Sequence, residues 1–269
     1  MPEGDTVWRT AHRLDEVFAG TELTLADLRW PGLSTLQLAG RRTVEVVSRG
    51  KHILHRLGGD GGVPLTIHSH LRMDGQWRVQ PAASRVPAAH EIRAVLGTAR
   101  YTAIGRLLGM LDVVRTSDEP TLVGHLGPDL LGPDWDAARA VANLRSAGAA
   151  SRNLAVGPAL LDQRNLAGIG TMWAAESLFL ERINPLTPVA DLTDDRLRAL
   201  VVRAQRLVDA NRHFPIPSGT GVRRHGHEHY AHGRRRKPCR RCGTPIVLEW
   251  AGPPAQERTF YFCPRCQPR

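Results

Sequence analysis

The stretch LLDQRNLAGIGTMWAAESLFLERINP, residues 160–185, contains two apolar helical segments separated by a glycine-containing turn. Gly168 and Gly170 lie in that turn, where glycine lets backbone N–H groups and a helix N-terminus approach an anion closely. Asp162 and Gln163 stand at its start. A tight turn inside an ordinary core would give the same short pattern, so this signal alone is weak. Other parts of the chain must show whether an anionic partner is expected.

The charge of the chain favours such a partner. Its 269 residues include 36 lysines and arginines against 26 acids, a formal net charge of +10. Arginine supplies nearly all of the excess, because Lys51 and Lys237 are the only lysines. Arginine forms bidentate contacts to phosphate, which favours a nucleic acid. The alternative to a nucleic-acid partner is that the basic composition has no binding role.

Hydropathy excludes a membrane protein. A hydrophobic content of 42% is typical of a globular chain. No apolar run approaches the roughly 18 residues that a membrane span needs, and the N-terminus has no basic segment followed by an apolar one. We therefore expect a cytoplasmic, nucleoid-associated monomer. Its four cysteines are not expected to form disulfides in a reducing compartment.

Residue periodicity divides the chain into a β-rich part and a helical part. Thr6–Phe18 has one apolar helical face, and the region from about Leu23 to Arg115 reads as short strands between turns. Many short strands after one helix predict a β-sandwich with a flanking helix. The expected strands are 43–47, 52–57, 64–69, 76–80, 91–96 and 100–104.

The second half of the chain reads as helical. Asp134 is placed to cap a helix over Trp135–Ser146, and Thr193 to cap a helix with a clear 3.6-residue period. The segment Phe214–Arg236 predicts a flexible basic loop. Its four histidines leave a second metal site open as an alternative: His225, His227, His229 and His232.

The strongest local signal is a pair of cysteine motifs. Cys239-x2-Cys242 is followed, after twenty residues, by Cys263-x2-Cys266. Four thiolates at this spacing predict one structural Zn²⁺ per chain on a two-stranded ribbon. A redox CxxC is the alternative, but the second matching pair and Pro264 disfavour it. Four sulfurs leave no open position for water, so a catalytic zinc is not expected.

Many cations surround these cysteines. Arg258 stands where the ribbon would turn back, and we expect it to enter a DNA groove. A solvated basic surface is the alternative reading for most of the others. These are Arg234, Arg235, Arg236, Lys237, Arg240, Arg241 and Arg265.

The chain begins with MPEG. Taken alone, Pro2 and Glu3 fit an ordinary helix start, because proline suits the first turn and a carboxylate complements the helix dipole. Five motifs in order give these residues another meaning. They are MPEG (1–4), RGK (49–51), HLRMDG (70–75), LLDQRNLAGIG (160–170) and the ending PCRRCGTPI…RTFYFCPRCQ.

Together these motifs resemble the formamidopyrimidine-DNA glycosylase/endonuclease VIII family of base-excision repair enzymes, and the opening is most similar to actinobacterial endonuclease VIII. The resemblance implies a multidomain α+β fold with damaged DNA in a cleft. An N-terminal helix plus β-sandwich (1–123) would precede a linker (124–134). A helix–two-turn–helix domain (135–228) and a zinc-finger β-ribbon (229–269) would follow.

The resemblance also implies a bifunctional enzyme that removes an oxidised base and cuts the strand by β,δ-elimination. Pro2, exposed by removal of Met1, would form the Schiff base. Glu3 would donate and accept protons, and Lys51 would donate a proton or contact phosphate.

Further positions match the DNA-binding residues of the family. His70 and Arg258 would bind phosphate, and Met73 would fill the space left by the displaced base, with Leu71 and Arg72 as neighbours. The backbone contacts at the glycine turn would come from Gln163, Gly170 and Thr171.

Two departures from the family pattern bear on specificity. Thr171 stands where asparagine is common, and a hydroxyl has a shorter reach to phosphate. The stretch IGRLLGML, residues 104–111, has no aromatic residue in the wedge that 8-oxoguanine enzymes carry. We therefore expect oxidised pyrimidines as the main substrates. The alternatives are formamidopyrimidine/8-oxoguanine specificity or a catalytically silent damaged-DNA-binding protein.

Overall fold

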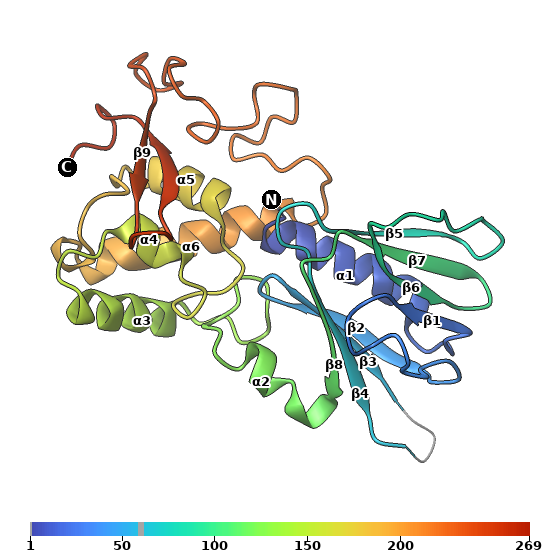
Figure 1. Cartoon of the computed structure of the whole chain (residues 1–269). Helices are drawn as coiled ribbons and strands as arrows, with labels where there is room; N and C mark the ends of the chain where they lie inside the picture. Colours follow the sequence, from blue (N-terminus) through green and yellow to red (C-terminus); the bar gives the residue numbers. More distant parts are fainter. Residues whose placement is uncertain (1, 59–61) are drawn as a thin grey trace. The chain divides into compact units, whose positions relative to one another are not determined.

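The computed structural model describes residues 2–58 and 62–269, and these form two compact units (Figure 1). One unit holds Pro2 and residues 6–125, and the other holds residues 3–5 and 126–269. The first turn of helix α1 (Gly4–Phe18) thus clusters with the second unit, while the rest of α1 belongs to the first.

The first unit is built on two antiparallel four-stranded sheets, which confirms the predicted β-sandwich. One sheet has the order β1-β6-β7-β5 and the other β2-β3-β4-β8. The strands are β1 (Leu25–Leu28), β2 (Thr43–Arg49), β3 (His52–Leu57), β4 (Leu65–His70), β5 (Gln76–Pro81), β6 (Ile92–Gly97), β7 (Tyr101–Arg106) and β8 (Met110–Arg115).

Helix α1 supplies one side of this unit's core. Val7, Ala11, Leu14 and Phe18 are buried on its apolar face and pack with residues of both sheets. Their spacing is the helical period that predicted this helix. The sequence did not predict β1 and β8, because β1 has only four residues and Asp112 interrupts the apolar pattern of β8.

The sheet β2-β3-β4-β8 has two different faces. Ile53, Ile67 and Leu111 point into the apolar core. Because side chains alternate along a strand, the residues next to them lie on the opposite face. That face is polar. It carries the ion pair between Arg56 and Glu119, whose Nη2 and Oε2 atoms are 2.7 Å apart.

The second unit is helical around one apolar core. Trp173, Leu178 and Leu200 are fully buried there. The helices are α3 (Ala137–Ala150), α4 (Val156–Leu161), α5 (Thr171–Leu180) and α6 (Asp194–Asn211); a short α2 (Pro120–Val123) lies in the first unit. Two short 3₁₀ helices are Thr116–Asp118 and Val189–Asp191.

The helix caps confirm one prediction and correct another. Thr193 caps α6, its Oγ1 accepting from the N–H of Arg196 at 3.3 Å. The predicted cap of α3 at Asp134 is wrong. Asp136 accepts from Ala138 N at 2.8 Å and from Arg139 N at 3.1 Å, so α3 begins two residues later than predicted.

Most of the predicted linker 124–134, namely residues 126–134, belongs to the second unit. Leu126 and Leu130 are buried, and Asp129 forms a parallel bridge with Ala167. The loop conformation therefore results from packing against the turn between α4 and α5.

Residues 212–238, all of them described, form no helix or strand, yet the segment is anchored. The buried carboxylate of Glu176 accepts from the N–H groups of Tyr230, Ala231 and His232 at 2.8–3.0 Å. Gly219 packs so closely against it that a Cβ there would lie 2.2 Å from Glu176 Oε2. The segment predicted to be a flexible loop is therefore held in place at Gly219 and at residues 230–232.

The chain ends in an antiparallel ribbon of β9 (Val247–Ala251) and β10 (Arg258–Phe262). Phe260 of this ribbon is fully buried, and its ring lies against Gly157 of α4. The ribbon is therefore packed onto the helices of the second unit. Across the part of the chain that the structure describes, no helix is long and apolar enough to cross a membrane.

Candidate active site and metal centre

Glu3 joins the beginning of the chain to the N-terminus of helix α5. Its carboxylate is buried, and it accepts hydrogen bonds from Gly170 N and Met172 N at 2.8 Å and from Trp173 N at 3.2 Å. The first N–H groups of a helix have no partner within the helix, and they carry its positive dipole end. Glu3 therefore caps α5 from a position 167 residues earlier.

Glycines make this approach possible. A Cβ on Gly170 would lie 2.4 Å from Glu3 Cδ, so no side chain fits there. Gly168 has a φ of +99°, a backbone conformation that other residues rarely adopt, and its carbonyl accepts from Gly4 N at 2.8 Å. Gly168 and Gly170, noted in the sequence, therefore allow Glu3 and Gly4 to bind this turn.

Pro2 precedes this anchor directly and is partly exposed. Because Glu3 and Gly4 are both hydrogen-bonded to the turn, the position of Pro2 is restricted by its neighbour instead of fraying as chain ends commonly do. The removal of Met1, on which the predicted role of Pro2 depends, concerns a residue outside the described part of the chain.

Lys51 lies in the tight turn between β2 and β3, where Gly50 has a φ of +58°. His52, the next residue, is the register partner of His70 at the end of β4. Directly opposed residues share one face of a sheet, and the two imidazole centroids are 4.8 Å apart. The structure therefore brings His70 close to the turn that carries Lys51.

The protonation of His70 follows from its hydrogen bond. Its Nδ1 accepts from the backbone N–H of Arg72 at 2.9 Å, so the neutral ring carries its proton on Nε2. Burial, helped by the nearby charges of Arg72 and Lys51, lowers the pKa of His70 to about 4. His70 is thus an uncharged N–H donor at neutral pH.

Met73 follows this strand in the loop before β5 and is 62% exposed. Arg72 adopts a φ of +56°, and its Nη2 lies 3.5 Å from Met110 Sδ. Leu107, in the loop before β8, is the second exposed apolar side chain of this region. Leu71 and Leu108, by contrast, are buried in the core, which removes Leu71 from the candidates that could enter DNA.

Gln163 and Thr171 lie on either side of the glycine turn. The Gln163 amide donates to the carbonyls of Leu161 and Ile169 and accepts from Gly168 N, all at 2.9–3.0 Å. These bonds brace the turn internally. Thr171 is the first residue of α5 and is partly exposed.

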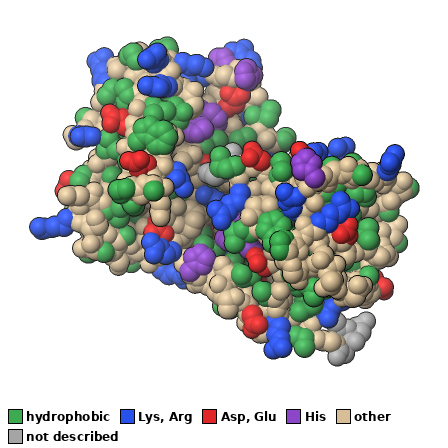
Figure 2. Space-filling view, in the orientation of Figure 1, with side chains coloured by type: hydrophobic (Ala, Val, Ile, Leu, Met, Phe, Trp, Pro, Cys, Tyr) green, Lys and Arg blue, Asp and Glu red, His purple; other side chains and the backbone are tan. Residues whose placement is uncertain are grey.

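Arg258 is exposed at the start of β10, directly after the turn of the ribbon. Its guanidinium donates to the carbonyls of Gln256 and Glu257 in that turn. Figure 2 shows further lysine and arginine side chains on the visible face of both units, with acidic side chains between them.

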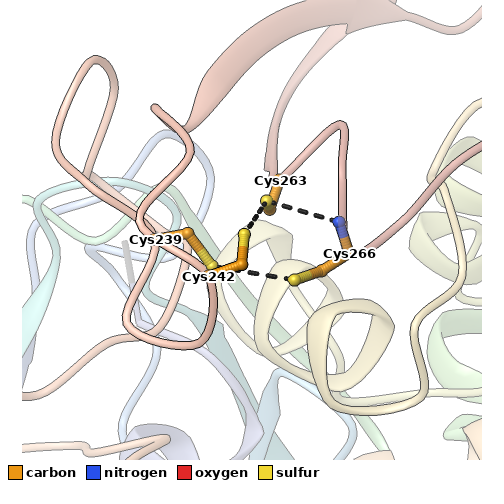
Figure 3. A group of neighbouring side chains, drawn as sticks. All are labelled: Cys239, Cys242, Cys263 and Cys266. Atoms are coloured by element: carbon orange, nitrogen blue, oxygen red, sulfur yellow. Dashed lines mark hydrogen bonds between the residues drawn. The ribbon is translucent and has the colours of Figure 1, made fainter.

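The four predicted cysteines come together (Figure 3). Cys242 and Cys263 have their sulfurs 3.5 Å apart, Cys239 and Cys266 4.0 Å apart, and all four sulfurs lie within 4.8 Å of one another. A tetrahedral ion with metal–sulfur bonds of about 2.3 Å separates its ligands by about 3.8 Å, so the cluster fits one metal ion. None of the four forms a disulfide.

Neighbouring groups support the cysteine cluster. Backbone N–H groups of Arg241 and Cys266 donate to the sulfurs of Cys239 and Cys263 at 3.4 Å. Burial raises the pKa of the Cys266 thiol to about 12, while hydrogen bonds from Thr244 lower that of Cys242 to about 6. The cluster therefore needs a cation before all four sulfurs are thiolates.

The histidines of the 225–232 segment form no comparable cluster. Within residues 2–58 and 62–269, the four cysteines are the only group of three or more His, Cys, Asp or Glu side chains placed to hold a metal. His229 and His232 instead stack edge to face, with centroids 5.5 Å apart.

Comparison with known proteins identifies the family. Residues 1–104 match the formamidopyrimidine-DNA glycosylase N-terminal domain, and residues 126–211 match the H2TH domain of the same enzymes. The chain therefore belongs to the formamidopyrimidine-DNA glycosylase family, a class of DNA glycosylases and abasic-site lyases.

Particular relatives place it nearer to endonuclease 8. It is 49% identical to a probable endonuclease 8 2 of Streptomyces coelicolor, over 99% of this chain and 94% of that protein. It is 43% identical to the DNA-(apurinic or apyrimidinic site) lyase Nei2 of Mycolicibacterium smegmatis, over 99% of both. Identity to the formamidopyrimidine-DNA glycosylase of Latilactobacillus sakei is 29%, over 99% of this chain and 98% of that one.

The fold matches solved structures of the same family. The formamidopyrimidine-DNA glycosylase of Lactococcus lactis, in a complex with DNA containing an oxidised pyrimidine, superposes with a TM-score of 0.82. That match has 22% identity and covers the whole of both chains.

Sequence reasoning missed several residues around these sites. Neither the hydrogen bonds between Glu3 and the start of α5 nor those between Glu176 and residues 230–232 could be predicted, because both join residues far apart in the sequence. His68 contacts His52, and Asp112 contacts His68. His68 is a buried polar residue of β4, and Asp112 interrupts the apolar pattern of β8. That interruption of the pattern was the signal that could have revealed them.

A Gly170→Ala substitution tests the Glu3 anchor. The added methyl group cannot coexist with the Glu3 carboxylate, so we expect a loss of about 1–3 kcal/mol of stability and at least a roughly tenfold slower cleavage of abasic-site DNA. Thermal unfolding and single-turnover cleavage measure the two effects. Gly62→Ala, whose Cβ would meet nothing closer than 3.6 Å, is the control. Wild-type behaviour of Gly170→Ala would contradict the assigned geometry.

Proposed function

We propose that the chain is a bifunctional DNA glycosylase/AP lyase of base-excision repair that acts on oxidised bases, mainly pyrimidines, through Pro2. The observation that carries this proposal is the buried Glu3 carboxylate on the N-terminus of α5, which restrains the residue next to the terminal amine. The proposed partner is damaged DNA, bound by a monomer. The domain limits 1–123, 135–228 and 229–269 are part of the proposal. Residues 124–134 are the proposed connecting segment, although 126–134 pack within the second unit.

The nucleophile is the secondary amine of Pro2 after removal of Met1. An α-amino group is partly neutral near pH 7 and can attack the sugar C1′. The C1′–N bond to the damaged base then breaks, and an iminium forms. This cation cannot be discharged by loss of an N–H, so it withdraws electrons and acidifies the C2′ proton. Elimination of the 3′ phosphate and then of the 5′ phosphate follows.

Glu3 acts beside this amine. Three backbone N–H donors and the helix dipole favour its ionised form, so its first tasks are to accept a proton and to stabilise the developing positive charge. Protonation of this carboxylate would also weaken its hydrogen bonds with the N–H groups at the start of α5.

Phosphate contacts come from the turn and strand end described above. Lys51 supplies an ammonium group that contacts phosphate or protonates the departing base, and His70 supplies the neutral Nε2–H donor set by Arg72. Arg258 binds the DNA backbone from the ribbon. Gly170, Thr171 and Gln163 place the glycine turn beside a phosphate. Because the Gly170 N–H donates to Glu3, the Thr171 hydroxyl would make the direct hydrogen bond, while Gln163 braces the turn.

Displacement of the damaged nucleotide needs a wedge in the base stack. Met73 fills this role, because its apolar side chain is 62% exposed in the loop that follows His70. Leu107, 40% exposed in the adjacent loop, adds a second aliphatic contact. Neither is aromatic, which favours oxidised pyrimidines over 8-oxoguanine, in agreement with the relatives named endonuclease 8.

The metal of the four-cysteine cluster is Zn²⁺, one per chain and structural. Four thiolates in a tetrahedral arrangement suit zinc and leave no coordination site for a reactive water. When bound, the metal supplies folding free energy to the ribbon. The ribbon in turn carries Arg258.

Covalent trapping tests the role of Pro2. With borohydride and abasic-site DNA, the wild-type chain should form a stable adduct, because reduction fixes the iminium. Pro2→Gly, or a chain that retains Met1, should give at least about a hundredfold less adduct. The measurement is the fraction of labelled DNA that migrates with protein.

The control is Arg13→Gln, at a position on α1 whose side chain is 56% exposed, and it should leave trapping intact. Tight DNA binding without any wild-type adduct would support the silent DNA-binding alternative and refute the enzyme.

A panel of lesions tests the substrate preference. We expect thymine glycol, dihydrouracil and 5-hydroxycytosine to be excised at least about tenfold faster than 8-oxoguanine, because the loop at residues 104–111 has no aromatic wedge. Single-turnover excision from otherwise identical duplexes measures this. Faster excision of 8-oxoguanine would support the formamidopyrimidine/8-oxoguanine alternative.

Removal of the metal tests the zinc proposal. Cys263→Ser should lose the single zinc measured by atomic emission, and its DNA affinity should fall at least about tenfold because the ribbon unfolds. The double variant His225→Gln/His227→Gln should keep one zinc per chain. A metal content that falls with the histidines and not with the cysteine would contradict the assignment.

A further inference from the structure

Three side chains on the polar face of the sheet β2-β3-β4-β8 form a hydrogen-bonded chain. Asp112 Oδ2 lies 2.9 Å from His68 Nδ1, and His68 Nε2 lies 2.8 Å from His52 Nδ1. The His68 side chain is fully buried, whereas Asp112 is 42% exposed. The hydrogen-bonded chain therefore leads from the surface, along this face of the sheet, to the residue that follows Lys51.

The hydrogen bonds determine where the protons lie. A carboxylate only accepts, so His68 carries its proton on Nδ1 and offers the lone pair of Nε2. His52 must then donate through its Nδ1–H, which leaves its own Nε2 as an acceptor. His70, beside it, has the opposite tautomer and presents an N–H donor. Two neighbouring histidines thus present opposite hydrogen-bonding character.

The surroundings keep His52 uncharged in the free protein. Burial, then His70, His68, His125 and Arg72, lower its pKa to about 3. Arg49, its register partner on β2, and the adjacent Lys51 add positive charge on the same side, and Asp112 is the one carboxylate in the hydrogen-bonded chain. A fixed cation at this position would repel these neighbours even without DNA.

We infer that His52 is a further phosphate-binding residue that becomes charged only when DNA binds, and that His68 and Asp112 position it and share its charge. This inference rests on the proposed function, in which a DNA phosphate lies beside Lys51 and His70. The lone pair on neutral His52 Nε2 would repel a phosphate oxygen. One proton taken from solvent onto Nε2 removes the repulsion, and the imidazolium then donates to phosphate through Nε2 and to His68 through Nδ1.

In a catalytic triad, a carboxylate hydrogen-bonds a histidine and fixes its orientation. Here the carboxylate of Asp112 acts on His52 in the same way, but through the imidazole of His68. Asp112 fixes the tautomer of His68, and His68 fixes the ring of His52, whose centroid lies 5.0 Å away at an interplanar angle of 24°. Neither His68 nor Asp112 needs to touch DNA. Both are positioning residues, and their effect should appear in the proton balance of binding.

Proton uptake on binding is the direct test. A duplex that contains a tetrahydrofuran abasic analogue is titrated into the full-length, metal-loaded protein in buffers of different ionisation enthalpy, between pH 5.5 and 7.5. We expect the wild type to take up about one proton more than His52→Gln at the acidic end. Phosphate buffer is avoided because it competes for the same residues.

The sign of the pH dependence follows from the bound state. Phosphate raises the pKa of His52 above its free value, so the added affinity is present below the bound-state pKa and is lost as pH rises through it. The Kd of the wild type should therefore rise by up to about tenfold per pH unit in this range. The slope for His52→Gln should be smaller.

Further variants separate positioning from folding. Asp112→Asn, at a partly exposed site, should reduce proton uptake by half or more without changing the unfolding temperature, and Asp112→Glu should restore part of it. His68→Gln should also abolish uptake. His70→Gln should weaken binding but leave the proton count unchanged, because neutral His70 already donates. His90→Gln, on an exposed loop, is the matched control.

Equal proton uptake by the wild type and His52→Gln would overturn the inference, and so would unchanged uptake in Asp112→Asn together with His68→Gln. Borohydride trapping on the same samples tests the enzyme independently. If the wild type is trapped on abasic DNA but its proton uptake does not depend on His52, the proposed function stands and the inference about His52 fails. A wild type that is not trapped fails the proposed function first.

Discussion

A buried carboxylate on the N-terminus of α5 is the constraint on which the candidate active site depends. Burial of Glu3 would be costly if its charge had no partners, and three N–H groups of the helix supply them. The same contact gives the first turn of the helix the hydrogen bonds that it lacks. One interaction therefore stabilises the helix and restrains the chain terminus. Gly170 is necessary because only a residue without a side chain leaves room for it.

Local patterns predicted much of the fold. Apolar periodicity located α1, six strands of the sandwich and α6 with its Thr193 cap, and cysteine spacing located the metal cluster, because these signals lie within short stretches. The α3 cap was misassigned because Asp134 and Asp136 are both good capping residues. The choice between them depends on how Trp135 packs against the helical core. No local pattern could predict the bond between Glu3 and Gly170, which joins residues 167 positions apart.

Two kinds of positive charge are available to this protein. Arginines such as Arg258 are permanently charged, so they stand on the surface where water screens their repulsion. The half-buried end of the sheet already holds Lys51 and Arg72, and further fixed charge there would oppose folding. Histidine suits that position because its neutral form packs at low cost and its charged form binds phosphate. At this end of the sheet, the choice of histidine over arginine therefore follows burial.

The anchor of the 212–238 segment has a consequence for how this loop can change over evolutionary time. Glu176 holds Tyr230, Ala231 and His232 through backbone N–H groups only. Every amino acid except proline offers the same group, so these three hydrogen bonds do not depend on the identity of the side chains. Packing does restrict two of them, because Ala231 is fully buried and Tyr230 stacks on Phe179. At exposed positions such as Val222, Arg224 and His225, mutations can accumulate and new side chains can be presented from an unchanged backbone. Glu176 itself and Gly219 have no such freedom.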